Sequence, residues 1–170
     1  MSNQYVMHRG AARSERRRFT NPWLFPLEIG CYAGLFFGVI RWISYEMNFT
    51  RVLPGFLLDS FFSHDFLRSW WGISAGIACF IALSIVAALL YKVALGKFKG
   101  PWAGIFYGIG WWAVLFGLIC PLLGMTPWMN KIGWNTIFTE LSVMTVWGLF
   151  IGFSIAFEFT DEASREPMNA

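Results

Sequence analysis

The stretch "WWGISAGIACFIALSIVAALLYKV", residues 70–93, decides the fold class. It contains no Asp, Glu, Lys or Arg before Lys92. A helix of about 20 mainly apolar residues crosses the hydrocarbon core of a bilayer, which is about 30 Å thick. Lipid offers no hydrogen-bond partners to the backbone, so a single segment of this kind has to cross as a helix. We therefore expect a membrane-spanning helix here.

Three further stretches are long and apolar enough to do the same, at about residues 24–47, 101–123 and 132–157. The whole chain of 170 residues is 56% hydrophobic and only 14% charged, whereas soluble domains average about 25% charged residues. The sequence therefore predicts an all-α, polytopic membrane protein built as a four-transmembrane-helix bundle. It divides into a basic arm, a membrane domain and a short acidic tail, at residues 1–22, 23–158 and 159–170.

Positive charges predict the orientation of these spans, because cytoplasmic loops carry an excess of Lys and Arg. The arm, the second loop with its edge, and the tail together hold nine such residues: Arg9, Arg13, Arg16, Arg17, Arg18, Lys92, Lys97, Lys99 and Arg165. The first and third loops hold three: Arg51, Arg68 and Lys131. We expect both termini to be cytoplasmic, and the first and third loops to face outward.

The first outer loop, "PGFLLDSFFSHDFLRSWW", has apolar residues that would share one side of a helix: Leu57, Leu58, Phe61, Phe62 and Phe66. This pattern is typical of a short helix lying in the membrane interface. The alternative is a lid or docking surface over the bundle.

Each predicted span contains small residues four apart, and these are Gly30, Gly34, Gly38, Gly72, Gly76, Gly104, Gly108, Gly148 and Gly152. Glycines at this spacing make a flat groove that lets helix backbones approach closely, which is how helices associate in lipid. The pattern predicts tight helix packing. It leaves open whether the glycine faces meet within one chain or between copies.

Two opposite charges lie inside predicted spans, Arg41 in the first and Glu140 in the fourth. At about 1.5 Å per residue, they would lie about 8 Å and about 9 Å below the outer ends of their spans. A charge inside the membrane costs at least about 2.5–3.5 kcal/mol, so it normally has a partner. We expect the two to pair, within a polar patch completed by Asn135, Thr136, Thr139 and Ser142.

This pair has two interpretations. It can be structural and fix the register of two helices, or it can belong to a proton, ion or substrate site. Arginine keeps its proton and would hold Glu140 ionised, which counts against a simple proton relay. A second pair is expected at the inner interface, where Lys92 can reach Glu28.

Motifs of known chemistry are absent. The sequence has no phosphate-binding glycine loop, zinc-binding HExxH, GxSxG nucleophile turn or cysteine pair of redox spacing. Its three cysteines are scattered over different spans, and its two histidines argue against a histidine-rich metal site. We expect no enzyme activity, no cofactor and no metal. The basic arm can contact anionic lipid, a protein or nucleic acid, but a role in topology is favoured and no nucleic-acid partner is expected.

Four segments carry a resemblance to a known family. They are "RRRFTNPW" at the end of the arm, "GCYAGLFFGVIRW" in the first span, "SWWGI" at the start of the second and "TPWMNKIGWNTIFTELSV" at the entry to the fourth. Together they make the chain resemble the YqhR-type conserved membrane proteins of spore-forming Gram-positive bacteria, over nearly its full length. The resemblance implies a bacterial plasma-membrane location, and it implies no site residues because that family has no assigned biochemical function.

The functional expectation is a non-catalytic membrane protein that acts through helix–helix assembly with itself or with another membrane protein. The alternative is a small transporter or channel subunit that uses Glu140, Arg41 and the polar patch. Small multidrug transporters also have four spans and one buried glutamate, but the expected arginine partner weakens that analogy. A solvent-lined cavity at Glu140 would favour transport, and a dry closed contact would favour assembly.

Overall fold

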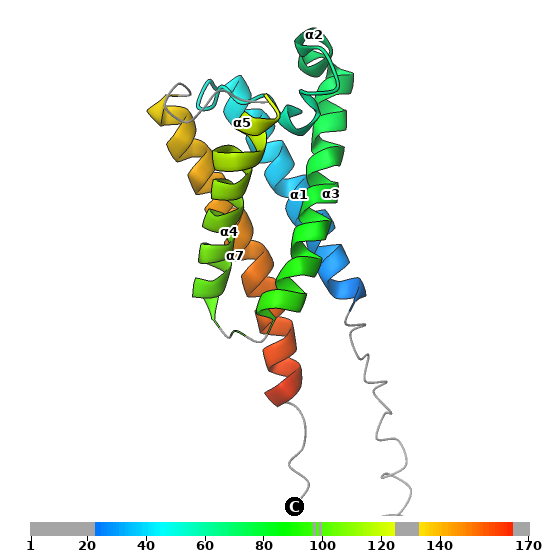
Figure 1. Cartoon of the computed structure of the whole chain (residues 1–170). Helices are drawn as coiled ribbons and strands as arrows, with labels where there is room; N and C mark the ends of the chain where they lie inside the picture. Colours follow the sequence, from blue (N-terminus) through cyan, green and yellow to red (C-terminus); the bar gives the residue numbers. More distant parts are fainter. Residues whose placement is uncertain (1–22, 97, 99, 125–132, 165–170) are drawn as a thin grey trace, which may run out of the picture.

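The computed structural model describes residues 23–96, 98, 100–124 and 133–164, with side chains up to residue 158. Within these residues it is all helical and has no strand. Four helical units are long and apolar enough to span a membrane: α1 (Leu24–Glu46), α3 (Trp70–Leu95), Pro101–Leu122 and α7 (Trp134–Ser164) (Figure 1). This confirms the predicted all-α class and the four candidate spans. The predicted basic arm lies outside the described residues.

Local chemistry explains where the helices begin. The Ser69 hydroxyl accepts a hydrogen bond from the Gly72 backbone N–H at 3.2 Å and so caps α3. Pro101 opens α4 (Pro101–Val114), where its fixed φ suits a first turn. At the other end of the chain, α7 continues to Ser164, so the predicted acidic tail begins as helix.

The third span is one helical unit with a wider turn inside it. After α4 the chain forms a π-helical turn, η2 (Leu115–Ile119), and then the short α5 (Cys120–Leu122). Pro121 has no N–H to donate, and its ring would clash with the carbonyl one turn earlier in a regular α-helix. The π turn just before it relieves that conflict, and π turns of this kind often accompany functional positions.

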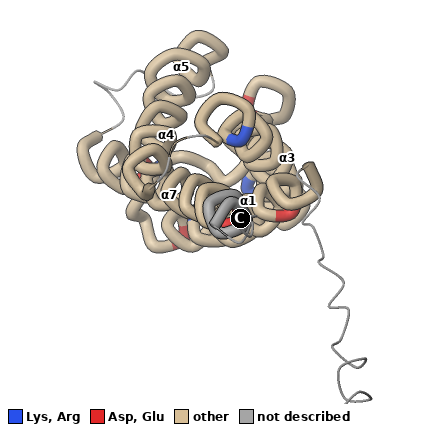
Figure 2. The backbone as a smooth tube through the Cα atoms, turned by 90° about the horizontal axis from the view of Figure 1, so that it is seen from below, with Lys and Arg blue, Asp and Glu red and all other residues tan. Residues whose placement is uncertain are grey.

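The helices are arranged as two pairs. Viewed along the helices, α1 lies beside α3 and α4 beside α7 (Figure 2). Contact between the two pairs is much less extensive and runs mainly from α1 to α7. We call this contact between the pairs the seam. Side chains fill it, including the ring contacts Phe37–Phe150, Phe80–Trp147 and Tyr91–Tyr107.

Glycine explains the tightness of each pair. A Cβ at Gly30 would lie 2.6 Å from the Ile85 Cα of α3, and one at Gly152 would lie 2.5 Å from the Gly104 Cα of α4. Backbone atoms are also the nearest obstacles at most other positions of the predicted glycine rows: Gly34, Gly72, Gly76, Gly104, Gly108 and Gly148. Gly38 instead meets the side chain of Ile77. All nine glycines are thus packed within one chain.

The first loop differs from the single amphipathic helix expected there. It forms two short pieces, η1 (Phe56–Leu58) and α2 (His64–Arg68). Phe61 remains 78% exposed, whereas Phe56 and Leu67 are buried. The reason lies in the residues before η1, because the backbone at Gly55 approaches Gly76 of α3 so closely that a Cβ on Gly76 would lie 2.5 Å from the Gly55 Cα.

We call residues 49–56 the strap. Most of it is buried, and it enters the bundle between the two pairs instead of lying over their ends. In Figure 1 the strap is at the upper end of the bundle, which we call the loop end. The opposite end, where α1 begins and α7 ends, is the terminal end.

Candidate functional site

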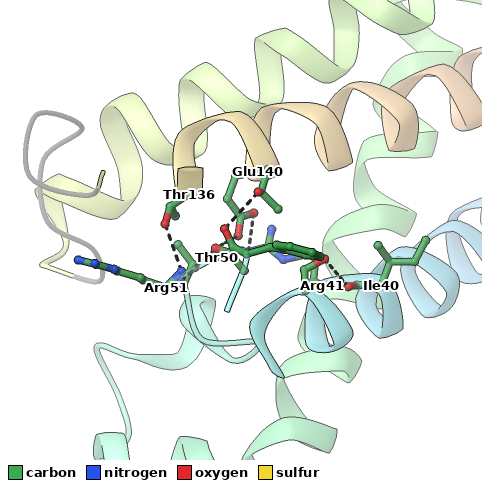
Figure 3. A network of polar contacts seen from close by, with 10 residues as sticks. Ile40, Arg41, Thr50, Arg51, Thr136 and Glu140 are labelled. Atoms are coloured by element: carbon green, nitrogen blue, oxygen red, sulfur yellow. Dashed lines mark hydrogen bonds and ion pairs between the residues drawn. The ribbon is translucent and has the colours of Figure 1, made fainter. Parts of the chain in front are cut away.

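The two charges predicted to pair inside the membrane domain are in contact. Arg41 Nη2 of α1 lies 3.0 Å from Glu140 Oε2 of α7 (Figure 3). Both residues are enclosed, with only 3% of Arg41 and 2% of Glu140 exposed. The contact crosses the seam and therefore joins the two helix pairs. The contact is closed, because protein encloses both side chains.

Aromatic rings surround the guanidinium. The Arg41 Cζ lies 4.4 Å from the ring centroid of Phe56, 5.4 Å from that of Phe80 and 5.6 Å from that of Phe116. A cation over a ring face is attracted by the ring quadrupole, most strongly when water is excluded. The rings come from the strap, from α3 and from the π turn. The Arg41 guanidinium therefore contacts three separate elements.

Thr50 of the strap completes the carboxylate site. Its hydroxyl donates to Glu140 Oε1 at 2.7 Å and accepts from the Val52 N–H at 3.1 Å. Sequence reasoning missed Thr50 because it lies in a loop, about half the chain away from Glu140, and its entry into the bundle has no periodic signal. The one hint in the sequence was that apolar residues follow Thr50 closely, namely Val52, Leu53 and Phe56.

Two of the predicted patch residues hold the strap instead of the carboxylate. The Thr136 hydroxyl accepts from the Arg51 N–H at 3.2 Å, and the Thr139 hydroxyl donates to the Phe49 carbonyl at 3.1 Å. Thr136 lies one helical turn before Glu140 and so shares its face.

The other two patch residues do not join the site. Asn135 and Ser142 are exposed on α7. On a helix, positions two and five residues from Glu140 point well away from it, which explains their absence from this network. The predicted patch was therefore too wide, and the structure keeps only its half that faces the seam.

The buried network is only partly satisfied. Among the described residues, no hydrogen bond of good geometry reaches Arg41 Nε, Nη1 or Nη2, or Glu140 Oε2. The 3.0 Å contact is thus a charge contact that lacks hydrogen-bond alignment. A buried ion pair gains most when its remaining donors and acceptors are also satisfied. Arg41 therefore keeps N–H donors without a hydrogen-bond partner, although its side chain is almost fully shielded from solvent.

The second predicted pair, Glu28 with Lys92, stays a prediction. The Glu28 side chain is exposed. The Lys92 ammonium lies 3.8 Å from the ring centroid of Trp23, which places the end of α3 against the start of α1. An aromatic face at the membrane boundary competes well for a lysine whose stem lies along apolar surface.

The described residues also contain an apolar groove that no sequence pattern indicated. Its volume is about 700 Å³, and its lining runs from the terminal end of α3 along α4, with Leu95, Phe98, Trp102, Phe106, Tyr107 and Trp111 as its larger residues. Within the described part of the chain, no group of three His, Cys, Asp or Glu side chains is placed to hold a metal ion.

Comparison with known proteins places the chain in a family. The family model described as "Conserved membrane protein YqhR" matches residues 14–170. A curated relative, "Uncharacterized protein YqhR" of Bacillus subtilis (strain 168), is 28% identical over 141 residues, covering 83% of this chain and 79% of the relative. No solved structure matches. The buried Arg41–Glu140 site thus belongs to a conserved membrane protein of the YqhR family.

Proposed function

We propose that this multi-pass membrane protein is non-catalytic and acts by assembling laterally with itself or with another membrane protein. The observation that carries the proposal is the closure of the Arg41–Glu140 site, where both side chains are almost fully enclosed. A carboxylate used for transport has to meet water or substrate on at least one side. A sealed contact that joins two helix pairs suits a scaffold better.

The glycine rows no longer supply the surface for this assembly, because they are packed inside the chain. The least covered span is the third, of which 22% is buried, compared with 44% of the fourth. Large apolar side chains such as Trp102 and Phe106 are exposed on it. The glycines therefore serve packing within the chain. The exposed apolar face of the third span remains available for a partner in the bilayer.

We also propose that both termini face the cytoplasm of a bacterial plasma membrane. The excess of Lys and Arg in the arm, the second loop and the tail supports this orientation. Reporter domains that are active on one side of the membrane, fused in turn to each terminus, test it. We expect the reporter that is active in the cytoplasm to be active at both ends. Activity of the reporter that works outside the cytoplasm, at either end, would contradict this orientation.

A transporter or channel subunit is the second candidate, and one observation favours it. Arg41 has three guanidinium nitrogens without a hydrogen bond of good geometry from the described residues. Such donors can serve an anionic substrate in another conformation of the bundle.

One experiment separates the two candidates. Native membranes containing the protein are dissolved directly into polymer nanodiscs, and the particle mass is measured alongside solute flux in reconstituted vesicles. Assembly predicts particles with more protein than one chain, and no flux that depends on Glu140. Single-chain particles, together with a flux that Glu140→Gln abolishes, would overturn the assembly proposal.

A further inference from the structure

Each helix pair is built as a rigid unit. Within both pairs, backbone meets backbone across glycine, and a single added methyl group would collide with the facing helix, as at Gly30 and Gly152. Packing of this kind has no slack, because closely packed interiors do not deform continuously. Movement within the molecule is therefore easier between the pairs than inside either pair.

The seam has the opposite character. Side chains fill it, and it contains buried polar groups whose needs are not fully met, namely the Arg41 nitrogens, Glu140 Oε2 and the Tyr91 hydroxyl. A buried polar group that lacks a hydrogen-bond partner is destabilising. A network that is only partly satisfied leaves room for a second arrangement of similar free energy.

The strap connects the two rigid units at the loop end. It continues directly from α1, and its Gly55 packs against Gly76 of α3, so it belongs to the first pair. The Phe49 and Thr50 backbone N–H groups donate to the Ser44 carbonyl at the end of α1. The hydrogen bonds that involve side chains of another helix join the strap to the second pair, from Thr50 to Glu140, from the Arg51 N–H to Thr136 and from Thr139 to the Phe49 carbonyl. Figure 3 shows this crossing, with the Thr50 side chain at Glu140 and the Arg51 backbone at Thr136 of α7.

The π turn of the third span lies beside the strap. The ring of Phe56 stacks on Phe116 with centroids 5.4 Å apart, and Phe116 belongs to this turn. Turns of this kind frequently accompany functional positions. Deeper in the seam, the Trp147 N–H donates to the Ser84 hydroxyl at 3.0 Å and does not depend on the strap.

We propose that the strap is a latch that holds the two helix pairs together at the loop end, and that its release lets the pairs separate there and uncovers Arg41 and Glu140. The Thr50–Glu140 hydrogen bond is the catch, because it is the shortest strap contact and ends on the same carboxylate that faces Arg41. The Trp147–Ser84 contact keeps the pairs joined below it. This device is independent of whether the protein assembles or transports.

The test uses the full chain in nanodiscs with Thr50→Val, which keeps the shape of the side chain and removes the hydroxyl. Amide hydrogen exchange at Arg51 and Val52 reports on the strap, since both amides donate to threonine hydroxyls. Loss of one such contact predicts about three- to tenfold faster exchange. Thr145→Val is the matched control, because that hydroxyl bonds only to its own helix at the Leu141 carbonyl.

A distance measurement decides whether the strap controls the pairs. The three native cysteines are replaced, and spin labels are placed at the exposed positions Trp71 of α3 and Phe138 of α7, one on each pair. Thr50→Val is expected to add a population with a longer distance between these labels. Labels at Val114 of α4 and Phe138 of α7, both on the α4–α7 pair, should keep one distance in every variant.

The possible results are distinct. Faster exchange together with the longer distance supports the latch. Faster exchange with an unchanged distance overturns it, because the strap would then be only a local loop, and unchanged exchange overturns it as well. Should Thr50→Val fail to fold, Thr139→Val replaces it, since it removes the strap contact at the Phe49 carbonyl from a residue that is less buried than Glu140. Thr50→Ser, which retains the hydroxyl, is expected to restore the parent behaviour.

Discussion

The interface inside each helix pair and the seam between the pairs solve the same problem differently. Inside a pair, glycine brings backbones together, as at Gly108 against the Met144 carbonyl and the Thr145 Cα. Across the seam, side chains carry the contact, and their centre is a buried ion pair. The first interface depends on shape alone and tolerates no added atoms. The second depends on charge and can change its partners, so the two should respond differently to mutation.

The largest effect is expected at the ion pair. Arg41→Gln or Glu140→Gln alone should lower the free energy of unfolding by about 3 kcal/mol, because each leaves a buried charge without its partner. The double mutant should lose much less than the sum of the two. Unfolding of the solubilised protein measures the cycle, and simple additivity of the two losses would show that the charges are not coupled.

Glycine replacement should come next. Gly108→Ala is expected to cost about 2 kcal/mol, because its Cβ would collide with the backbone of α7. Gly110→Ala is the control on the same helix, since nothing lies within 4 Å of its added Cβ. That control should be neutral or slightly stabilising because alanine favours helix. Thermal unfolding of the two variants compares them, and equal losses would mean that α4 and α7 do not meet through glycine.

A smaller effect is expected from the strap. Thr50→Val should cost about 1 kcal/mol, the net value of one buried hydrogen bond. Thr145→Val removes a hydroxyl bonded within its own helix and should change stability by less. Chemical unfolding in one detergent measures both. A larger loss from Thr145→Val would contradict the role of Thr50 at the seam.

The smallest effects should occur on the far side of α7. Asn135→Ala and Ser142→Ala are expected to change stability by no more than about 0.5 kcal/mol, since both residues are exposed. The same unfolding measurement applies to them. A loss as large as that of Glu140→Gln at either position would return that residue to the polar site and widen the seam beyond its present limits.

Sequence reasoning was most accurate where one physical rule dominated. The α3 segment was predicted at residues 70–93 and runs over Trp70–Leu95, because a long uncharged run has no other stable arrangement in lipid. The Arg41–Glu140 contact also followed from the sequence, since two opposite charges at similar depth both need a partner. The predicted orientation of the termini remains a prediction.

Errors arose where residues could choose among neighbours. Sequence reasoning did not name Trp23 as a neighbour of Lys92, because a long side chain at the membrane boundary has several partners within reach. The first loop was predicted as one helix from its apolar spacing, but a buried strap precedes its two short helices. The spacing of apolar residues describes a single helix. It does not indicate that a loop segment can insert between two other helix pairs.

The sequence by itself therefore determined the number of spans, their helical form and the need to neutralise two buried charges. These follow from the bilayer, which imposes the same thickness and lack of hydrogen-bond partners on any chain. Only the tertiary structure decided that the glycine rows pack within the chain and that Thr50 reaches Glu140. These contacts join distant segments, and their geometry depends on how all four helices pack at once.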